Sequence, residues 1–180
     1  MILCLGGVVL VAGCASPVQT DYKTGIDFSK YHTFALLPLP QQSSAEDPGR
    51  ALRLAQPARE AVETEMTAKG LKETLANDAD LTINLRGQSL PRVEVQNYGY
   101  TYPAVTRYGT VTVIQNPYTT VSTYHERTLI VEMFDRASKE MVWVGWMKKN
   151  SSGPVTAEVL QDAIRKVLAK FPPPPEPKTP

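Results

Sequence analysis

Two histidines and two neighbouring aspartates are the side chains whose types could perform acid–base chemistry. His32 and His125 are the only imidazoles, and each lies beside a tyrosine in a stretch of strand-forming residues. We therefore expect surface or cross-strand roles for both. Asp78 and Asp80 could supply the paired carboxylates of a hydrolase, but the run from Asn77 to Asp80 is typical of a turn. Such a hydrolase would need a second acid that the tertiary structure brings close. We therefore keep hydrolysis as an alternative function and do not make it the main prediction.

Other motifs of catalysis and cofactor binding are missing from the sequence. It contains no phosphate-cradling glycine loop, no zinc-ligand spacing and no G-x-S-x-G nucleophile elbow. With 19 Lys or Arg against 18 Asp or Glu, the net charge of +1 leaves no basic footprint for nucleic acid. We predict no catalytic residues, no metal and no cofactor.

Cys14 is the residue with the most specific chemistry. Residues 1–15 are uncharged and nearly all apolar, and Val11-Ala12-Gly13-Cys14 resembles the bacterial lipobox, in which the thiol of the cysteine receives diacylglycerol. The run is too short to span a bilayer. The sequence predicts a lipoprotein signal peptide over residues 1–13, lipidation at Cys14 and a tether over residues 14–20.

Two alternatives accompany this interpretation. The segment could be a buried strand with two incidental cysteines. No Lys or Arg precedes the apolar run, so either the amino group of Met1 supplies the positive charge or the true start lies upstream. If Cys14 is acylated, two or three acyl chains hold the protein stably, and Ala15 in place of aspartate favours export to the outer membrane.

The rest of the sequence predicts one domain. Cys4 would leave with the signal peptide, so the mature body would have no thiol pair and would fold without a disulfide. Its segments are expected to be a strand over 31–37, a helix over 57–69 opened by Pro57, strands over 71–75 and 81–85, a hairpin of 128–134 with 141–147, and a helix over 157–170 capped by Thr156.

These segments define a fold class. They predict an α+β domain over residues 21–171, a twisted antiparallel sheet with two helices packed on one face. Trp143 and Trp146 lie on opposite sides of their strand, so at least one should be in the core. Residues 172–180 contain repeated prolines and are expected to form a disordered tail.

Several short blocks resemble a known family, the bacterial lipoprotein domain of unknown function numbered forty-one thirty-six. They are Asp21-Tyr22, Ile26 to Ala35, Ala79 to Ile83, Val142 to Gly145, and the ending Lys170-Phe171-Pro172. The similarity covers about residues 20–172. It departs at Leu36, where tryptophan is common, and at Val144, where a basic residue often stands. The resemblance implies an envelope lipoprotein with an α+β body and brings no catalytic residues.

The segment from Gln96 to His125 has an unusual composition. It contains a single charged residue, Arg107, and six of the eight tyrosines. In an extended chain, rings two residues apart share one face and can stack on sugars or dock a protein. We assign protein or glycan contact to Tyr98, Tyr100, Tyr102 and Tyr108. The alternative is a long hairpin or loop whose tyrosines cover the sheet.

Together these features predict an outer-membrane-anchored lipoprotein on the periplasmic face of a Gram-negative bacterium. It would act as a non-enzymatic binding or structural module of the cell envelope, with the membrane as partner through its lipid anchor and an envelope protein or glycan as a further partner. The alternative from another class is a small carboxylate-dependent hydrolase of envelope glycans.

Overall fold

A computed structural model describes residues 18–39, 49–105, 107, 109 and 111–174 of the chain. The predicted signal peptide, Cys14, Tyr108 and residues 175–180 of the predicted tail lie outside this description. The elements in chain order are β1 (Gln19–Tyr22), the 3-10 turn η1 (Phe28–Lys30), β2 (Thr33–Leu36), α1 (Arg50–Ala68), β3 (Lys72–Glu73), β4 (Leu81–Val105), β5 (Val111–Asp135), β6 (Met141–Ser151) and α2 (Ala157–Leu168).

The six strands form one sheet in the order β1-β6-β5-β4-β2-β3. The pairs β1–β6, β6–β5 and β5–β4 are antiparallel, whereas β2 runs parallel to both β3 and β4. The α+β class is confirmed, but the prediction of a purely antiparallel sheet is wrong. Helix α1 connects β2 to β3, and a helical crossover of this kind returns the chain so that the two strands run in the same direction.

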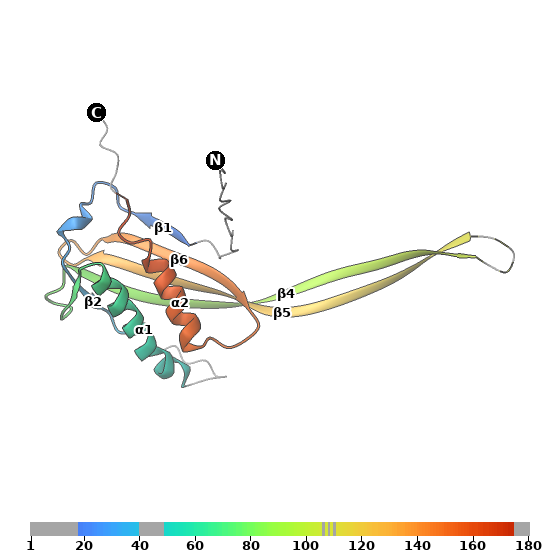
Figure 1. The fold of residues 1–180 in the computed structure, drawn as a ribbon, viewed down its shortest axis with the longest axis horizontal. Helices are drawn as coiled ribbons and strands as arrows, with labels where there is room; N and C mark the ends of the chain where they lie inside the picture. Colours follow the sequence, from blue (N-terminus) through green and yellow to red (C-terminus); the bar gives the residue numbers. More distant parts are fainter. Residues whose placement is uncertain (1–17, 40–48, 106, 108, 110, 175–180) are drawn as a thin grey trace, which may run out of the picture.

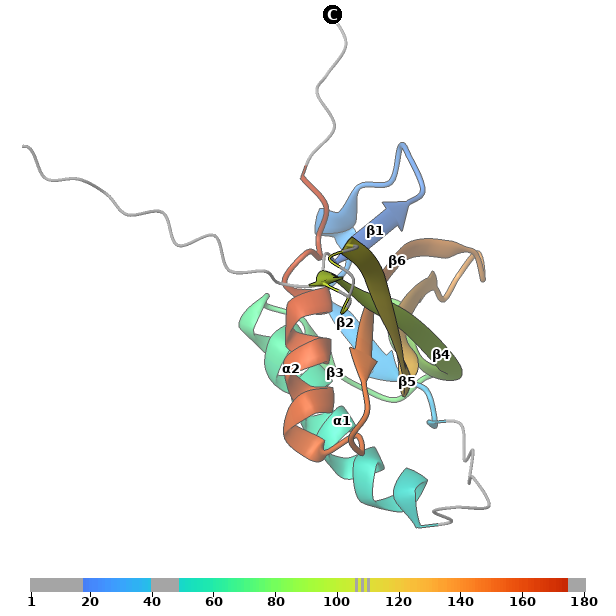
Figure 2. The ribbon, with the colours of Figure 1, turned by 90° about the vertical axis from the view of Figure 1, so that its right-hand side faces the viewer.

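Both helices cover one face of the sheet, as predicted (Figures 1 and 2). Alternate residues of β4 point to this face, and Leu81, Ile83 and Leu85 are buried there with Val131 and Met133 of β5. The helices contribute Val62, Met66, Ile164, Val167 and Leu168 to the same core. Among the described residues, no helix is long and apolar enough to cross a membrane.

Two local predictions have different outcomes. Helix α1 begins at Arg50, so Pro57 lies inside the helix and does not open it. Ala51, Leu52 and Ala55 are strong helix formers, and they extend the helix towards the N-terminus past the proline. Thr156 does cap α2, since its hydroxyl accepts a hydrogen bond from the N–H of Val159 at 3.4 Å.

The outer strands add two further details. Strand β1 begins at Gln19, so residues 19 and 20, which the sequence assigns to the tether, pair with β6. Trp143 of β6 is fully buried on the helix-covered face, while Trp146 is half-buried. The expectation that at least one of the two tryptophans is core is confirmed.

Strands β4 and β5 extend far beyond the rest of the sheet (Figure 1). Each is 25 residues long, but β6 stops pairing at Ser151, opposite His125. From there outwards the two strands form a two-stranded ribbon. We call residues 92–105 of β4 with residues 111–124 of β5 the arm. At about 3.3 Å per residue it is roughly 45 Å long.

Candidate functional site

The arm continues the ladder of the sheet without interruption. Leu81 pairs with Asp135 and every residue up to Val105 has one partner on β5, with no shift in register. The two faces of the sheet are therefore also the two faces of the arm, because partners directly opposite each other point to the same side. Odd-numbered residues of both strands lie on the side that the helices cover in the body.

The helix side of the ladder carries exposed valines near the base of the arm, although no helix covers it there. Val93, Val95 and Val121 are 66%, 56% and 61% exposed, and Val95 pairs directly with Val121. In the body the equivalent pair Leu85–Val131 is buried under the helices. The face of the sheet that packs against the helices in the body therefore continues into the arm, where its valines are exposed.

The opposite face of the arm carries the tyrosines that the sequence singled out. Tyr98 pairs with Tyr118 across the ribbon, and their rings are 48% and 64% exposed. For Tyr100 and Tyr102 the structure gives the strand register, which places them opposite Asn116 and Ile114. The alternative of a long hairpin is confirmed, because β4 and β5 pair throughout this segment. Its tyrosines do not cover the sheet at Tyr98 and Tyr118, since both lie beyond the end of β6.

Charged side chains are confined to the base of the arm. Arg92 Nη2 lies 3.3 Å from Glu126 Oε1, and Lys148 Nζ of β6 lies 3.8 Å from the same oxygen. Further out, the chain between Val95 and His125 has Arg107 as its single charged residue. A long surface without charged residues tends to associate with other surfaces, because no charge repulsion opposes the contact.

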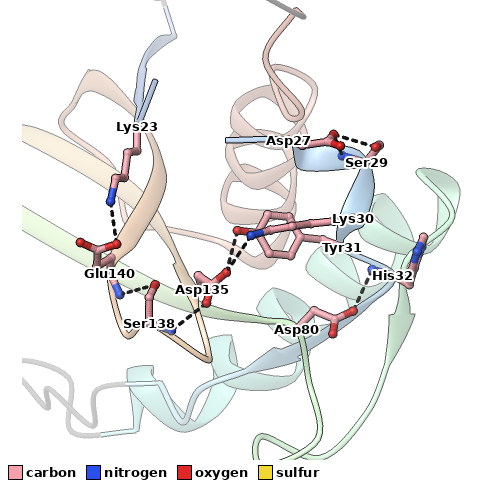
Figure 3. Close-up of polar contacts among 10 residues, drawn as sticks. All are labelled: Lys23, Asp27, Ser29, Lys30, Tyr31, His32, Asp80, Asp135, Ser138 and Glu140. Carbon is pink, nitrogen blue, oxygen red and sulfur yellow. Dashed lines mark hydrogen bonds and ion pairs between the residues drawn. The ribbon is translucent and has the colours of Figure 1, made fainter. Parts of the chain in front are cut away.

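A cluster of polar side chains in the body, separate from the arm, connects η1 to the turn between β5 and β6 (Figure 3). The buried hydroxyl of Tyr31 donates to Asp135 Oδ2 at 2.9 Å, and Lys30 Nζ lies 3.3 Å from the same oxygen. Asp135 Oδ1 accepts the N–H of Ser138 at 2.9 Å. These donors, the Ser138 N–H first, lower the pKa of Asp135 to about 2, while burial and the Asp135 carboxylate raise the pKa of Tyr31.

The aspartate pair of the sequence is separated into two different environments. Asp78 is exposed in the turn before β4. Asp80 Oδ2 instead accepts the backbone N–H of His32 (Figure 3) and that of Thr33, each at 2.9 Å. These hydrogen bonds lower the pKa of Asp80. The interpretation of this segment as a turn is confirmed, and Asp80 acts as a cap that holds the start of β2.

The two histidines lie in different parts of the molecule. His32 is exposed just before β2, and His125 lies on β5 at the base of the arm, where its Nδ1 is 3.3 Å from Ser89 Oγ. Among the described residues, no three metal-ligating side chains gather into one group.

A depression of about 620 Å³ lies beside η1. Phe28 and Phe171 form part of its wall, with ring centroids 5.7 Å apart, and Phe171 also contacts Trp143 at 5.5 Å. These rings are the outer end of the core. Asp27, its nearest carboxylate, accepts hydrogen bonds from Ser29.

Sequence reasoning missed two parts of the site. The first is the valine face of the arm, although Val93 and Val95 alternate with Arg92 and Glu94 in the period of a strand. The second is the contact of Tyr31 with Asp135, which joins residues 104 positions apart and has no local signal.

The fold and the arm define the class of the protein: a small α+β domain whose central hairpin projects as a largely uncharged ribbon. The chain belongs to the family of the domain of unknown function DUF4136, whose model matches residues 18–173. The family that the sequence blocks indicated is thereby confirmed. No curated protein matches the sequence.

Solved structures resemble this chain at low identity. A PDZ domain protein from Parabacteroides distasonis is 15% identical with a TM-score of 0.52; the match covers 89% of this chain and 36% of that one. A DUF4136 family protein from Bacteroides thetaiotaomicron is 16% identical, with coverages of 87% and 96% and a TM-score of 0.46. A PelC dodecamer from Paraburkholderia phytofirmans is 13% identical, with coverages of 86% and 95% and a TM-score of 0.45. The first of these likenesses supports the fold, and none bears on activity.

Proposed function

We propose that this protein is a lipoprotein anchored in the outer membrane on its periplasmic side, and that it acts as a non-enzymatic binding or structural module of the cell envelope. The observation that carries the proposal is the arm. It extends a sheet face of core character, with Val93, Val95 and Val121 exposed, beyond the part of the sheet that the helices cover.

A two-stranded ribbon is marginally stable by itself in water. Exposed apolar side chains on such a ribbon, together with open strand edges, are typical of a surface that is covered by a partner. The rings of Tyr98 and Tyr118 on the other face suit the same role, because tyrosine supplies a large contact area at low entropic cost.

The anchor is supported by the sequence around Cys14 and by the position of β1. Residues 15–18 alone separate Cys14 from Gln19, where β1 joins the sheet. A lipid on Cys14 would therefore hold the body within a few residues of the membrane surface. Two or three acyl chains at about 0.8 kcal/mol per buried CH₂ would make this attachment stable.

The state of the carboxylates favours binding over glycan hydrolysis. The general acid of a glycosidase is a carboxyl whose pKa is raised, so that it is protonated at working pH. Asp80 and Asp135 have lowered pKa values, and their oxygens are occupied by backbone N–H groups, a phenol and a lysine. Both residues are suited to holding the fold together.

Crosslinking in intact cells, followed by pull-down, tests the proposal. The variant replaces residues 95–121 by Asn-Gly, which shortens the arm and closes the ribbon after the pair Glu94–Ser122. We expect an unchanged melting temperature and loss of the wild-type crosslinks, because the core lies outside the deleted segment. Muramidase digestion of the adducts would separate glycan from protein partners. Crosslinks that persist unchanged in the shortened variant would refute the role of the arm.

A further inference from the structure

The β4 edge of the arm is the longest unpaired backbone edge that the structure describes. Strand β2 pairs with β4 only as far as Ile83, and among the described residues no strand pairs with β4 on that side from Asn84 to Val105. The opposite edge, that of β5, is covered by β6 as far as His125. Unpaired edges of this kind are templates for adding another strand.

Hydrogen bonding fixes which residues offer their backbone at this edge. Leu37 N–H donates to the carbonyl of Ile83, so Ile83 points its backbone away from β5. In an antiparallel ladder this direction alternates strictly, so every odd-numbered residue of β4 points outwards. Pro91 and Pro103 are odd-numbered, which explains why two prolines fit in the ribbon without breaking it.

The prolines divide each edge into segments that can and cannot accept a new strand. On β5 the outward positions are also odd-numbered, and Pro117 interrupts them in the middle of the arm. On β4 an uninterrupted run lies between Pro91 and Pro103. Its outward residues are Val93, Val95, Asn97, Gly99 and Thr101.

Asn97 is the midpoint between the two prolines, so an identical run can pair with this one antiparallel over its full length, with proline opposite proline at both ends. Resting on the role proposed above for the arm, we propose that the β4 edge pairs with the β4 edge of a second copy of this chain, antiparallel and about a two-fold axis at Asn97. In this register Pro91 of each copy lies opposite Pro103 of the other. Sliding the second strand by two residues in either direction brings a proline opposite a residue of the run and shortens the uninterrupted ladder.

The charges of the arm agree with this register. Arg92 would lie opposite position 102 of the second copy, and Glu94 opposite position 100. Both positions hold tyrosine, so no like charges would meet across the new pair. The product is a four-stranded antiparallel sheet in place of two separate ribbons. Two-stranded ribbons are marginally stable, and at least three strands with an apolar face are needed for independent stability. A two-fold contact is also the commonest way for identical chains to associate.

Disulfide trapping of the full-length protein in membranes tests the register. Asn97→Cys places two thiols at the two-fold axis, where paired Cα atoms lie about 5.5 Å apart, within reach of a disulfide. Thr119→Cys is the matched control, because Thr119 is the cross-strand partner of Asn97 on the same face of the arm. Its copies would be three strand spacings apart, roughly 14 Å, which is too far for a disulfide.

Under mild oxidant we expect a disulfide-linked dimer from Asn97→Cys and only the wild-type background from Thr119→Cys. The wild-type protein, treated in the same way, measures the background of disulfides formed by the native Cys4 and Cys14. Absence of the Asn97 dimer, or equal dimer from the two variants, would overturn the inference. If the arm still crosslinks another envelope component in that case, the proposed function stands without self-pairing.

A proline pair gives the second measurement. Val95→Pro removes an outward N–H from the β4 edge but no hydrogen bond within the ribbon, and Val121→Pro does the same on the β5 edge. We expect light scattering of the detergent-solubilised protein to give twice the chain mass for wild type and Val121→Pro, and the mass of one chain for Val95→Pro. The same mass for both proline variants would contradict pairing through β4.

Discussion

Tyr98 of β4 and Tyr118 of β5 are direct cross-strand partners in the arm, and both rings face solvent about halfway along it. Both residues lie beyond Ser151, where β6 stops pairing with β5, and on the face of the ladder that the helices do not cover. This pair therefore marks a surface that folding leaves open. We propose that this open surface, and not the carboxylates of the body, carries the function.

Replacement of the arm tyrosines separates binding from stability. The variant Tyr98→Ser, Tyr100→Ser, Tyr102→Ser should melt close to wild type and lose its crosslinks, since hot-spot aromatic rings contribute on the order of 2 kcal/mol or more to binding. Tyr31→Ser is the control, because Tyr31 is buried and bonded to Asp135; its melting temperature should fall clearly. A large fall in the triple variant would mean that these rings stabilise the fold.

Lipidation is tested at its acceptor residue. Cys14→Ser removes the only thiol placed at the end of the lipobox, so the variant should leave the membrane fraction and appear in the soluble one. Cys4→Ser lies within the predicted signal peptide and should leave fractionation unchanged. Sedimentation of the Cys14 variant with membranes, as in wild type, would rule out the anchor.

Gly145 is required by the packing of Trp143. A Cβ at position 145 would lie 2.7 Å from Val167 Cγ1 and 2.9 Å from Trp143 Cζ2, closer than real side chains approach. Gly145→Ala should destabilise the protein by about 1–3 kcal/mol, the usual effect of overpacking a core. Gly87→Ala, where a Cβ meets nothing within 4 Å, is the control. Chemical denaturation compares the two; equal stabilities would show that Trp143 can move aside.

The pH dependence of stability reports on Asp135. Its pKa is about 2 in the folded state and 3.8 in the unfolded state, so its ionised form stabilises the fold above about pH 4, and this contribution is lost as the pH falls towards 2. Asp135→Asn should cost at most about 2 kcal/mol at pH 7 and only a few tenths of a kcal/mol at pH 2, where about half of the carboxyl is already protonated in the folded state. Urea titrations across this range measure the difference. A constant difference between variant and wild type from pH 7 to pH 2 would contradict the assignment.

The elements that the sequence predicts well are those with one buried face. Leu81, Ile83 and Leu85 alternate with polar residues because the helices cover one side of β4, and the capped helix α2 is amphipathic for the same reason. The order of strands in the sheet has no such signal. The parallel position of β2 beside β4 depends on where α1 packs, which no local pattern encodes.

The two continuous strands of the arm are difficult to predict from the sequence, because they contain residues that usually end strands. Pro91, Gly99, Pro103 and Pro117 predict breaks when they are considered singly. In the structure each of these prolines occupies an odd-numbered position, and the backbone groups of odd-numbered residues point away from the partner strand. The missing N–H of proline therefore removes no hydrogen bond within the ribbon. The tyrosines of the site could be proposed from composition, whereas their exposure depends on where β6 ends, which is a property of the whole sheet.

Site-specific photocrosslinking in intact cells tests most directly whether the arm is the contact surface. A photoreactive residue at Tyr118, 64% exposed on the arm, is compared with one at Leu75, which is 75% exposed on the body. We expect discrete adducts of higher mass from position 118 and none from position 75. Adducts from position 75 with none from position 118 would contradict the proposed role of the arm.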